Sequence, residues 1–209
     1  EKFIDILGSV AETMITINYA DHIYTLSKGI SWITFQNECA AIRIDAQHCK
    51  QGKGITLYSS FKQNLKGDKI YTVFEDSEGD EWILTNKGIS IIGKKQVDSD
   101  FPFQYIKEAD GIIYLVSQSD KLASYNFKTR QFKFIEIPYH VSMINEVKKF
   151  DSNTLLLATD NGLIIYKIKE KEFQLIDIRT STQPSNVVQS VYQDHYKELW
   201  IFPQTTGVI

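Results

Sequence analysis

The residues best suited to metal or redox chemistry are two cysteines and the histidine beside one of them. Cys39 and Cys49 are the two cysteines of the chain, and His48 precedes Cys49. The thiols could form a disulfide, as oxidising compartments favour, or stay free and partly buried, and the sequence leaves both alternatives open. A structural zinc ion takes four protein ligands, and one His–Cys pair supplies two, so we expect no metal site. We expect the histidines to lie in surface loops: His22, His48, His140 and His195.

Sequence motifs for nucleophilic catalysis and phosphate binding are missing. The chain has neither a Gly-x-Ser-x-Gly segment, which positions a serine nucleophile, nor a Gly-x-x-x-x-Gly-Lys-Ser/Thr segment, which cradles phosphates. The acidic pairs Glu75–Asp76 and Asp80–Glu81 could serve acid/base catalysis or calcium binding. They fall in a predicted hairpin turn, however, where solvated carboxylates are the simpler interpretation. We therefore expect no catalytic residue and no cofactor.

Size and charge limit the remaining functions. The chain has 209 residues, of which 43% are hydrophobic and 23% are charged, as in an ordinary folded domain. The net charge of -3 argues against a nucleic-acid partner, because phosphate binding needs clustered Lys and Arg. No apolar run reaches the ~18 residues of a membrane span, and residues 1–5 lack the apolar stretch of a secretion signal. We expect any export signal or membrane anchor to lie outside this chain.

The residue types that must position any site favour strands. The chain holds 28 Ile against 8 Ala, with 11 Tyr and 12 Phe. β-branched and aromatic side chains fit a pleated surface, whereas Ala favours helices. Apolar and polar residues alternate, as in residues 15–18, in short runs interrupted by Gly, Asp and Asn. No segment shows three helical turns of apolar spacing, so the pattern predicts an all-β fold.

An internal repeat organises these strands. Residues 70–92 read as a strand, an Asp-Ser-Glu-Gly turn, a strand with a tryptophan, a short turn and a third strand that opens with glycine, and residues 188–209 repeat this plan. The step from Asp to Trp is six residues in both copies, at Asp76–Trp82 and Asp194–Trp200. Because these tryptophans share one repeat position, we expect them in the core rather than as sugar-stacking platforms.

Weaker copies bring the number of repeats to five, with starts near residues 14, 70, 103, 144 and 188. In this alignment the tryptophan place is taken by Tyr24, Tyr114 and Leu156, and Trp32 lies off the repeat frame. An insertion of roughly residues 36–68 separates the first two copies. A fourth strand follows several units, and we expect such strands at residues 132–137, at 173–178 and, as the last strand of a preceding unit, at 2–7.

Four-stranded units of about 40 to 45 residues are typical of β-propeller blades. One antiparallel sheet cannot cover both of its own faces, and radial stacking lets each blade cover the next. We therefore predict a single β-propeller domain, or a fragment of one, over residues 1–209, with about five four-stranded antiparallel blades. In a rival geometry the N-terminal strand completes the last blade and closes the ring.

The segment from Glu75 to Ile89, E-D-S-E-G-D-E-W-I-L-T-N-K-G-I, resembles the two-component regulator propeller repeat. Such repeats form the periplasmic sensor regions of hybrid two-component regulators in Bacteroides-type bacteria. The resemblance implies a longer protein with two seven-bladed propellers, a Y-shaped β-domain, a membrane helix and a histidine kinase. It also implies a glycan breakdown product as ligand, a homodimer formed through the full-length sensor, and no catalysis in this region. Since five copies fall short of seven blades, we expect a fragment of the sensor.

The parity of the strands predicts where a ligand would bind. Turns between second and third strands, and connections between blades, share one face of the ring. By analogy with the fold, propellers generally bind ligands on this face or near the central channel. Amides, hydroxyls and an aromatic ring on this face suit a neutral or acidic sugar, although ordinary polar turns are the simpler alternative for any single residue. The candidate ligand-binding residues are Asn86, Lys87, Gln118, Ser119, Tyr139, His140, Asp160, Asn161, Arg179, Thr205 and Thr206.

Two other functions compete with ligand sensing. The propeller could be a scaffold that docks another protein or dimerises, which a large apolar patch outside the blade seams would favour. It could also be an enzyme, as propeller lyases and quinone dehydrogenases are, but the sequence shows no convergent acid/base or metal-binding groups. We expect a sensing module whose partner is an oligosaccharide or another small ligand.

Overall fold

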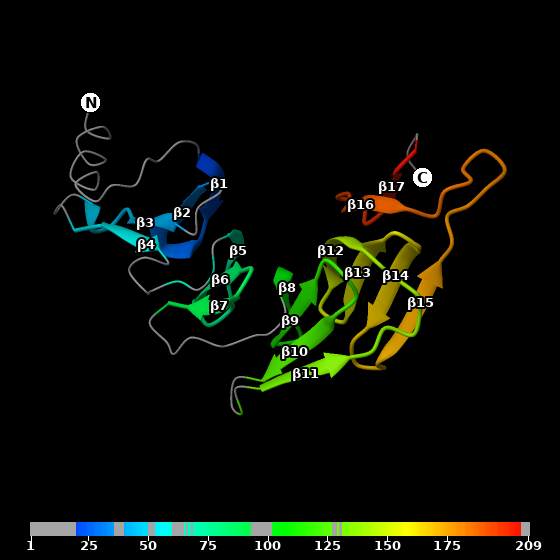
Figure 1. The fold of residues 1–209 in the computed structure, drawn as a ribbon, viewed down its shortest axis with the longest axis horizontal. Helices are drawn as coiled ribbons and strands as arrows, with labels where there is room; N and C mark the ends of the chain where they lie inside the picture. The colour runs from blue at the N-terminus through cyan, green and yellow to red at the C-terminus, as the bar shows by residue number, and fades with distance from the viewer. Residues whose placement is uncertain are drawn as a thin grey trace. The chain divides into compact units, whose positions relative to one another are not determined.

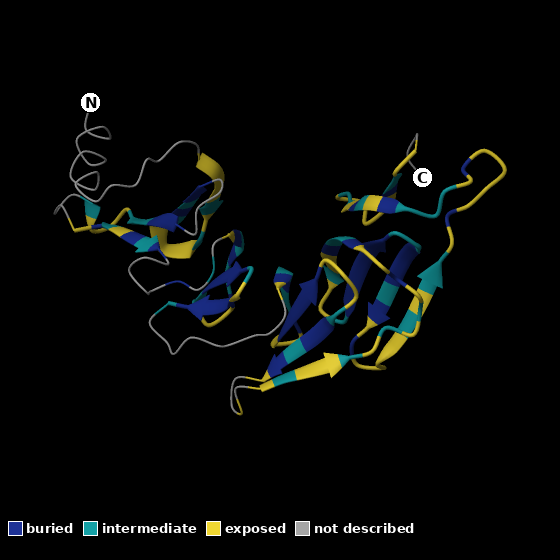
Figure 2. Ribbon diagram, in the orientation of Figure 1, coloured by how far each residue is buried: buried dark blue, intermediate teal, exposed yellow. Residues whose placement is uncertain are grey.

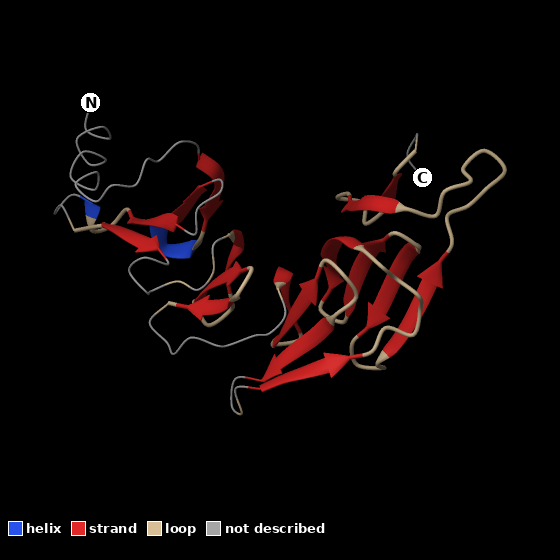
Figure 3. Cartoon of the chain, viewed as in Figure 1, coloured by secondary structure: helices blue, strands red, loops and turns tan. Residues whose placement is uncertain are grey.

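The computed structural model describes residues 20–35, 40–49, 53–59, 65, 67, 69–92, 102–126, 129 and 131–205. Strands dominate these residues, with a short 3-10 turn at Ser27–Gly29 (Figure 3). Every described strand pair is antiparallel. The predicted all-β fold is confirmed. Within the described ranges, no helix is long and apolar enough to cross a membrane.

The chain divides into two compact units, residues 1–100 and 101–209. This division does not test the prediction of a single domain over residues 1–209, which stays a prediction. In the first unit, consecutive strands are neighbours in a four-stranded and a three-stranded sheet. The strands of the first sheet are β1 (Ala20–Thr25), β2 (Ile30–Phe35), β3 (Ala40–Asp45) and β4 (Ile55–Ser59), and those of the second are β5 (Ile70–Glu75), β6 (Glu81–Thr85) and β7 (Gly88–Ile91).

The second unit contains three sheets with the same neighbour-to-neighbour order (Figure 1). The first has β8 (Phe103–Ala109), β9 (Ile112–Ser117), β10 (Leu122–Asn126) and β11 (Gln131–Ile135). The second has β12 (Ile144–Asp151), β13 (Thr154–Thr159), β14 (Gly162–Lys167) and β15 (Glu172–Ile176). The third has β16 (Val188–Gln193) and β17 (Leu199–Pro203). The five sheets match the five predicted repeats, and β11 and β15 match the predicted fourth strands, while residues 2–7 lie outside the described residues.

The strand register corrects the repeat frame of the first copy. Trp82 pairs across its hairpin with Phe74, and Trp200 pairs in the same way with Tyr192. In the first sheet the equivalent pair is Trp32 with Tyr24. Trp32, not Tyr24, therefore occupies the tryptophan place, and its assignment as off the frame was wrong. The two aromatic residues face each other across one hairpin, so the alternating pattern alone could not distinguish them.

The predicted insertion at residues 36–68 is also corrected. It contains β3 and β4, which complete the first four-stranded sheet by pairing with β2 and with each other. Because Tyr24 was aligned in place of Trp32, the first repeat was placed too early in the chain. Its third and fourth strands were therefore taken for an insertion. The first copy is thus a full blade whose first strand begins at Ala20 within the described residues.

Apolar side chains from neighbouring sheets form the cores, as radial stacking requires. Trp32 of the first sheet packs with Ile70, Val73 and Ile83 of the second sheet. In the second unit, one cluster joins β9 and β10 to β12–β14, and another joins β13 and β14 to β16 and β17. The middle strands β9 and β13 are largely buried, whereas β11 and β15 contain only exposed and half-buried residues (Figure 2). Burying one large aromatic side chain such as Trp32 contributes about 2 to 3 kcal/mol.

Two expectations about single side chains fail. Trp82 is fully buried, as predicted, but Trp200 is 43% exposed. Tyr192, which pairs with Trp200 across the hairpin, is also exposed, whereas Trp32 of the first sheet is covered by the second sheet. Asp76 was expected to be solvated, yet it is buried because the Trp82 indole and two backbone N–H groups donate to it.

The cysteine and histidine predictions are partly answered. Cys49 is a half-buried free thiol, and Cys39 lies outside the described residues. The alternative of a disulfide at Cys49 is therefore not realised in this structure. The four histidines are exposed, as expected, although His22 lies on strand β1 rather than in a loop.

Candidate functional site

A Thr-x-x-Gly sequence shapes the two turns that carry four of the eleven predicted ligand-binding residues. At the end of β13, the Thr159 hydroxyl donates to the Gly162 carbonyl at 2.7 Å and accepts the Asn161 N–H at 3.1 Å. Gly162 has a φ of 96°, and a Cβ there would lie 2.5 Å from the carbonyl oxygen of Ile176 on β15. Both the backbone conformation and the close approach therefore require glycine.

Three predicted ligand-binding residues hold these turns in place. The side-chain oxygen of Asn86, in the β6–β7 turn, accepts the N–H of Lys69 at 3.2 Å. The Asp160 carboxylate, in the β13–β14 turn, accepts the N–H of Ser142 at 3.1 Å. Asn161 donates its amide to a carbonyl in the connection between β11 and β12 at 3.0 Å. These bonds tie each turn to the segment that leads into the same sheet, and ligand binding by the three residues stays a prediction.

The predicted residues in the inter-blade connections also have local partners. Tyr139 packs against the core between two sheets, and its hydroxyl donates to the Phe173 carbonyl at 3.1 Å. His140 is exposed in the same connection. Arg179 is exposed and binds the neighbouring Asp177, with 2.9 Å from Nε to Oδ1. These hydrogen bonds hold the pKa of Asp177 at about 2, and they leave the Arg179 charge compensated.

The remaining predicted residues are dispersed. Lys87 is exposed in the β6–β7 turn of the first unit. Thr205, after β17, donates its hydroxyl to the side-chain oxygen of Gln183. Thr206 lies outside the described residues. None of these lines a described pocket together with the predicted residues of the second unit.

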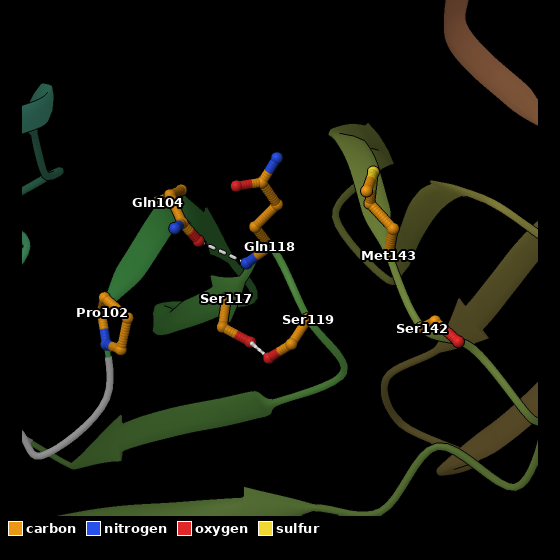
Figure 4. A pocket seen from close by; sticks show the side chains of 7 residues that line it. All are labelled: Pro102, Gln104, Ser117, Gln118, Ser119, Ser142 and Met143. Carbon is orange, nitrogen blue, oxygen red and sulfur yellow. Dashed lines mark hydrogen bonds between the residues drawn. The ribbon is translucent and has the colours of Figure 1, made fainter.

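A pocket of about 290 Å³ brings together two predicted residues, Gln118 and Ser119 (Figure 4). The β9–β10 loop and the start of β8 form one side, and the connection that leads into β12 forms the other. Sequence reasoning missed the other lining residues, because they come from the start of β8, from the last residue of β9 and from a connection without periodicity. They are Pro102, Gln104, Ser117, Ser142 and Met143.

Hydrogen bonds fix the loop that forms this pocket. The side-chain oxygen of Gln104 accepts the N–H of Gln118, and the hydroxyl oxygens of Ser117 and Ser119 lie 2.9 Å apart (Figure 4). The Gln118 carbonyl accepts the N–H of Ile144 at 2.7 Å, which ties the loop to β12. The carboxamide of Gln118 itself extends away from the loop, without a hydrogen bond to the other residues drawn (Figure 4).

The pocket offers uncharged hydrogen-bonding groups. Its lining provides two carboxamides, three hydroxyls, a proline ring and the thioether of Met143, without a charged side chain. Such a surface can bind a ligand that carries hydroxyl or amide groups and some apolar surface. Among the described residues, no group of three His, Cys, Asp or Glu side chains is placed to hold a metal ion.

A second pocket, of about 480 Å³, lies in the first unit along the seam between β1 and β5. Residues 23–27 and 73–75 line it, and none of them was predicted to bind a ligand. Ser27 donates its N–H to the Glu75 carboxylate at 2.6 Å and its hydroxyl to the other oxygen. These bonds, the hydroxyl bond foremost, lower the pKa of Glu75. This pocket follows a seam between strands and is not part of the predicted loop face.

Comparisons with known proteins give structural matches only. No protein-family model matches the chain, and no curated protein sequence matches it. A similar structure is the extracellular domain of a hybrid two-component system from B. thetaiotaomicron, with a TM-score of 0.67 and 21% identity over 93% of this chain and 27% of that one. The extracellular domain of a one-component system from the same organism has a TM-score of 0.66 and 18% identity over 93% of this chain and 28% of that one. Virginiamycin B lyase from Staphylococcus aureus has a TM-score of 0.66 and 16% identity over 90% of this chain and 67% of that one.

These likenesses establish the fold. The chain spans roughly a quarter of the length of the two extracellular domains, 27% and 28%. The fold expected from the repeat resemblance, that of extracellular domains of Bacteroides signalling systems, is confirmed by three such matches. The presence of a lyase among the neighbours shows that the same fold also supports catalysis elsewhere. The chain is a series of β-propeller blades.

Proposed function

We propose that the chain is part of the extracytoplasmic ligand-sensing region of a two-component regulator, and that it recognises a glycan breakdown product. The observation that carries the proposal is the pocket at the predicted loop face, where Gln118 and Ser119 meet Gln104, Ser142 and Met143. Carboxamides and hydroxyls match the hydroxyl groups of a sugar, and the thioether and proline match its apolar faces. Likeness in fold to extracellular domains of two-component systems supports the same function.

In this proposal the propeller has no catalytic step. Ligand binding shifts the population of signalling states because the ligand has a higher affinity for one of them. Segments outside this chain cross the membrane, carry the histidine kinase and complete the homodimer. The location is the periplasm, with the sensor held at the inner membrane by those segments.

Calorimetry of the chain with a panel of neutral gluco-, manno- and galacto-oligosaccharides and acidic oligogalacturonides tests the proposal. We expect one panel member to bind, and we expect Gln118→Ala to weaken binding by about tenfold, the loss expected for one hydrogen bond in a partly desolvated site. The matched control is Gln131→Ala on β11, an exposed glutamine away from the pocket, which should bind like the wild type. Absence of binding by every panel member would overturn the proposal.

A second candidate function, docking or dimerisation through a sheet face, has one observation in its favour. Tyr192, Tyr196 and Trp200 are exposed on the β16–β17 hairpin. Exposed aromatic clusters often mark interaction surfaces. Sedimentation of the chain tests this function: a dimer that Trp200→Ser dissociates would support it, and a monomer at high concentration would contradict self-association.

A further inference from the structure

A β-bulge recurs at the same place in the first strand of each sheet in the second unit. The register shifts between Phe103 and Tyr105, between Ile144 and Glu146, and between Val188 and Ser190. The extra, unpaired residues are Gln104, Asn145 and Gln189. All three are carboxamides, and the residue before each of them is buried and apolar.

The bulge position is polar or aromatic in the first unit as well. Register shifts there leave Asp21 and Tyr71 unpaired in β1 and β5. A bulge releases one residue from the alternation of the strand and re-aims its side chain, and bulges are frequent beside binding sites. The five repeats therefore share a backbone device that presents one side chain per blade, and the second unit fills this position with amides only.

The three bulged strands are neighbours. The Tyr105 hydroxyl on β8 donates to the Asn145 carbonyl on β12 at 2.7 Å. The Asn145 side-chain amide donates to the Val188 carbonyl on β16 at 2.7 Å. These contacts join β8, β12 and β16 at the level of the bulges, so Gln104, Asn145 and Gln189 form a row across adjacent strands, which we call the amide row.

Each side chain of the amide row keeps at least one polar group that makes no hydrogen bond to a described residue. Gln104 uses its side-chain oxygen for the Gln118 N–H, which leaves its NH2 group. Asn145 uses its NH2 group for the Val188 carbonyl, which leaves its oxygen. Gln189 is exposed and makes no side-chain hydrogen bond to a described residue. The row thus presents donors and acceptors in alternation, and it begins in the pocket because Gln104 lines that pocket.

We propose that the amide row binds an uncharged, polyhydroxylated ligand. This ligand extends from the pocket lined by Gln118 across β8, β12 and β16. The inference rests on the proposed function and deepens it by naming the residues and the ligand charge. Carboxamides can both donate to and accept from hydroxyl groups, which suits a ligand with several of them. The pocket lining contains no Lys or Arg to balance an acidic ligand, and a buried unpaired carboxylate of the ligand would cost affinity.

The experiment uses two substitutions that keep the fold-supporting bonds of the row. Gln104→Glu keeps an oxygen for the Gln118 N–H and removes the NH2 donor. Gln189→Ala removes a side chain without a partner among the described residues. The control is Gln174→Ala, an exposed strand glutamine on β15. Calorimetry with the same neutral and acidic oligosaccharides should show about tenfold weaker binding of a neutral oligosaccharide for each row variant and wild-type binding for the control.

Nuclear magnetic resonance gives a second readout that a general loss of folding would not mimic. The side-chain NH2 signals of Gln104 and Gln189, identified by their loss in the two variants, should shift when the neutral oligosaccharide binds to the wild type. The Gln174 signals should not shift.

The outcomes separate the row from the sensing function. If both row variants bind the neutral oligosaccharide as tightly as the wild type does, the proposed role of the amide row is overturned and the sensing function stands. If only acidic oligosaccharides bind, the inferred ligand charge is overturned. If the wild type binds no panel member, the sensing proposal and the row fall together.

Discussion

The indole Nε1 of Trp82 lies 2.8 Å from Oδ2 of Asp76, six residues earlier in the chain. The other oxygen of Asp76 accepts the N–H groups of Glu78 and Asp80 at 3.0 and 2.8 Å. One buried carboxylate thus closes the hairpin turn and holds the core indole. Asp194 repeats the arrangement, with 3.1 Å from its Oδ2 to Trp200 Nε1. The six-residue spacing of Asp and Trp in the repeat follows from this hydrogen bond.

Asp76→Ala should lower the free energy of unfolding of the first unit by about 2 to 3 kcal/mol, because it leaves an indole and two N–H donors without their acceptor. Asp76→Asn should cost less, since an amide oxygen can still accept either the indole or the turn N–H groups. Urea unfolding followed by Trp fluorescence measures both. Asp194→Ala is the matched control and should have a smaller effect, because its Trp200 partner is exposed. Equal losses at both sites would contradict the role of burial.

Gly162→Ala should destabilise the second unit by about 2 to 4 kcal/mol, because the new Cβ meets the Ile176 carbonyl at 2.5 Å and the φ of 96° disfavours any side chain. Gly111 is a matched control with a φ of 68°, and a Cβ added there would meet no atom within 4 Å. Gly111→Ala should therefore show only the backbone cost, about 1 kcal/mol. Thermal unfolding of the two variants tests the difference. Similar losses would mean that the neighbouring strand yields to the methyl group.

The strand content and the five repeats could be predicted from sequence because they rest on local patterns. The tryptophan place of the first blade could not be assigned by alternation, since Tyr24 and Trp32 face each other across one hairpin. A usable signal was the glycine three residues before two of the tryptophans, Gly29 before Trp32 and Gly79 before Trp82, both with positive φ. Lys197 takes the same place before Trp200 and also has a positive φ. Glycine spacing reports turn geometry, and turn geometry sets the register.

The site was harder to predict because tertiary contacts decide which polar groups are available. Asp160 and Asn161 are predicted ligand residues that also hydrogen-bond to a segment about twenty residues earlier, a contact that the sequence does not reveal. Gln104 was missed, although the buried pair Phe103 and Ile106 is spaced by three residues. A spacing of three within a strand breaks the two-residue period and indicates a bulge. The Asp76 carboxylate was misjudged because its partner Trp82 is brought to it only by the fold of the hairpin.

Glu81→Ala should destabilise the first unit by about 2 kcal/mol or more, because Glu81 serves two partners from the neighbouring sheet. It accepts the Trp32 indole N–H at 2.6 Å and binds the Arg43 guanidinium at 2.7 Å. The Glu81 hydrogen bond is the main cause of the raised pKa of Arg43. Chemical denaturation measures the loss. The control, Asp120→Ala, removes an exposed partner of Lys121 and should change stability by less than about 0.5 kcal/mol. If Glu81→Ala lowers stability no more than Asp120→Ala does, Glu81 does not stabilise the packing of the two sheets.

Arg179→Gln should raise the pKa of Asp177 from about 2 toward the ordinary range of a solvent-exposed aspartate. The hydrogen bonds from Arg179 lower the pKa in the folded state below that in the unfolded state, which is about 3.9. Their contribution to stability is therefore complete above that value and is lost as the pH falls toward 2. Carboxyl signals in an NMR titration measure the change. Arg179→Lys keeps the charge and should give a smaller rise, and an unchanged pKa in Arg179→Gln would contradict the pairing.

Iodide should quench the fluorescence of Trp200 and leave that of Trp32 and Trp82 largely intact. Trp32 and Trp82 are fully buried, whereas Trp200 is 43% exposed. Trp200→Phe should therefore abolish most of the quenchable emission, and Trp32→Phe, the matched control, should keep it. The three tryptophans share one repeat position, so any difference between them reports a difference in the exposure of that position. If iodide quenches all three tryptophans equally little, the β16–β17 face is covered in solution, which would contradict the exposure of Trp200.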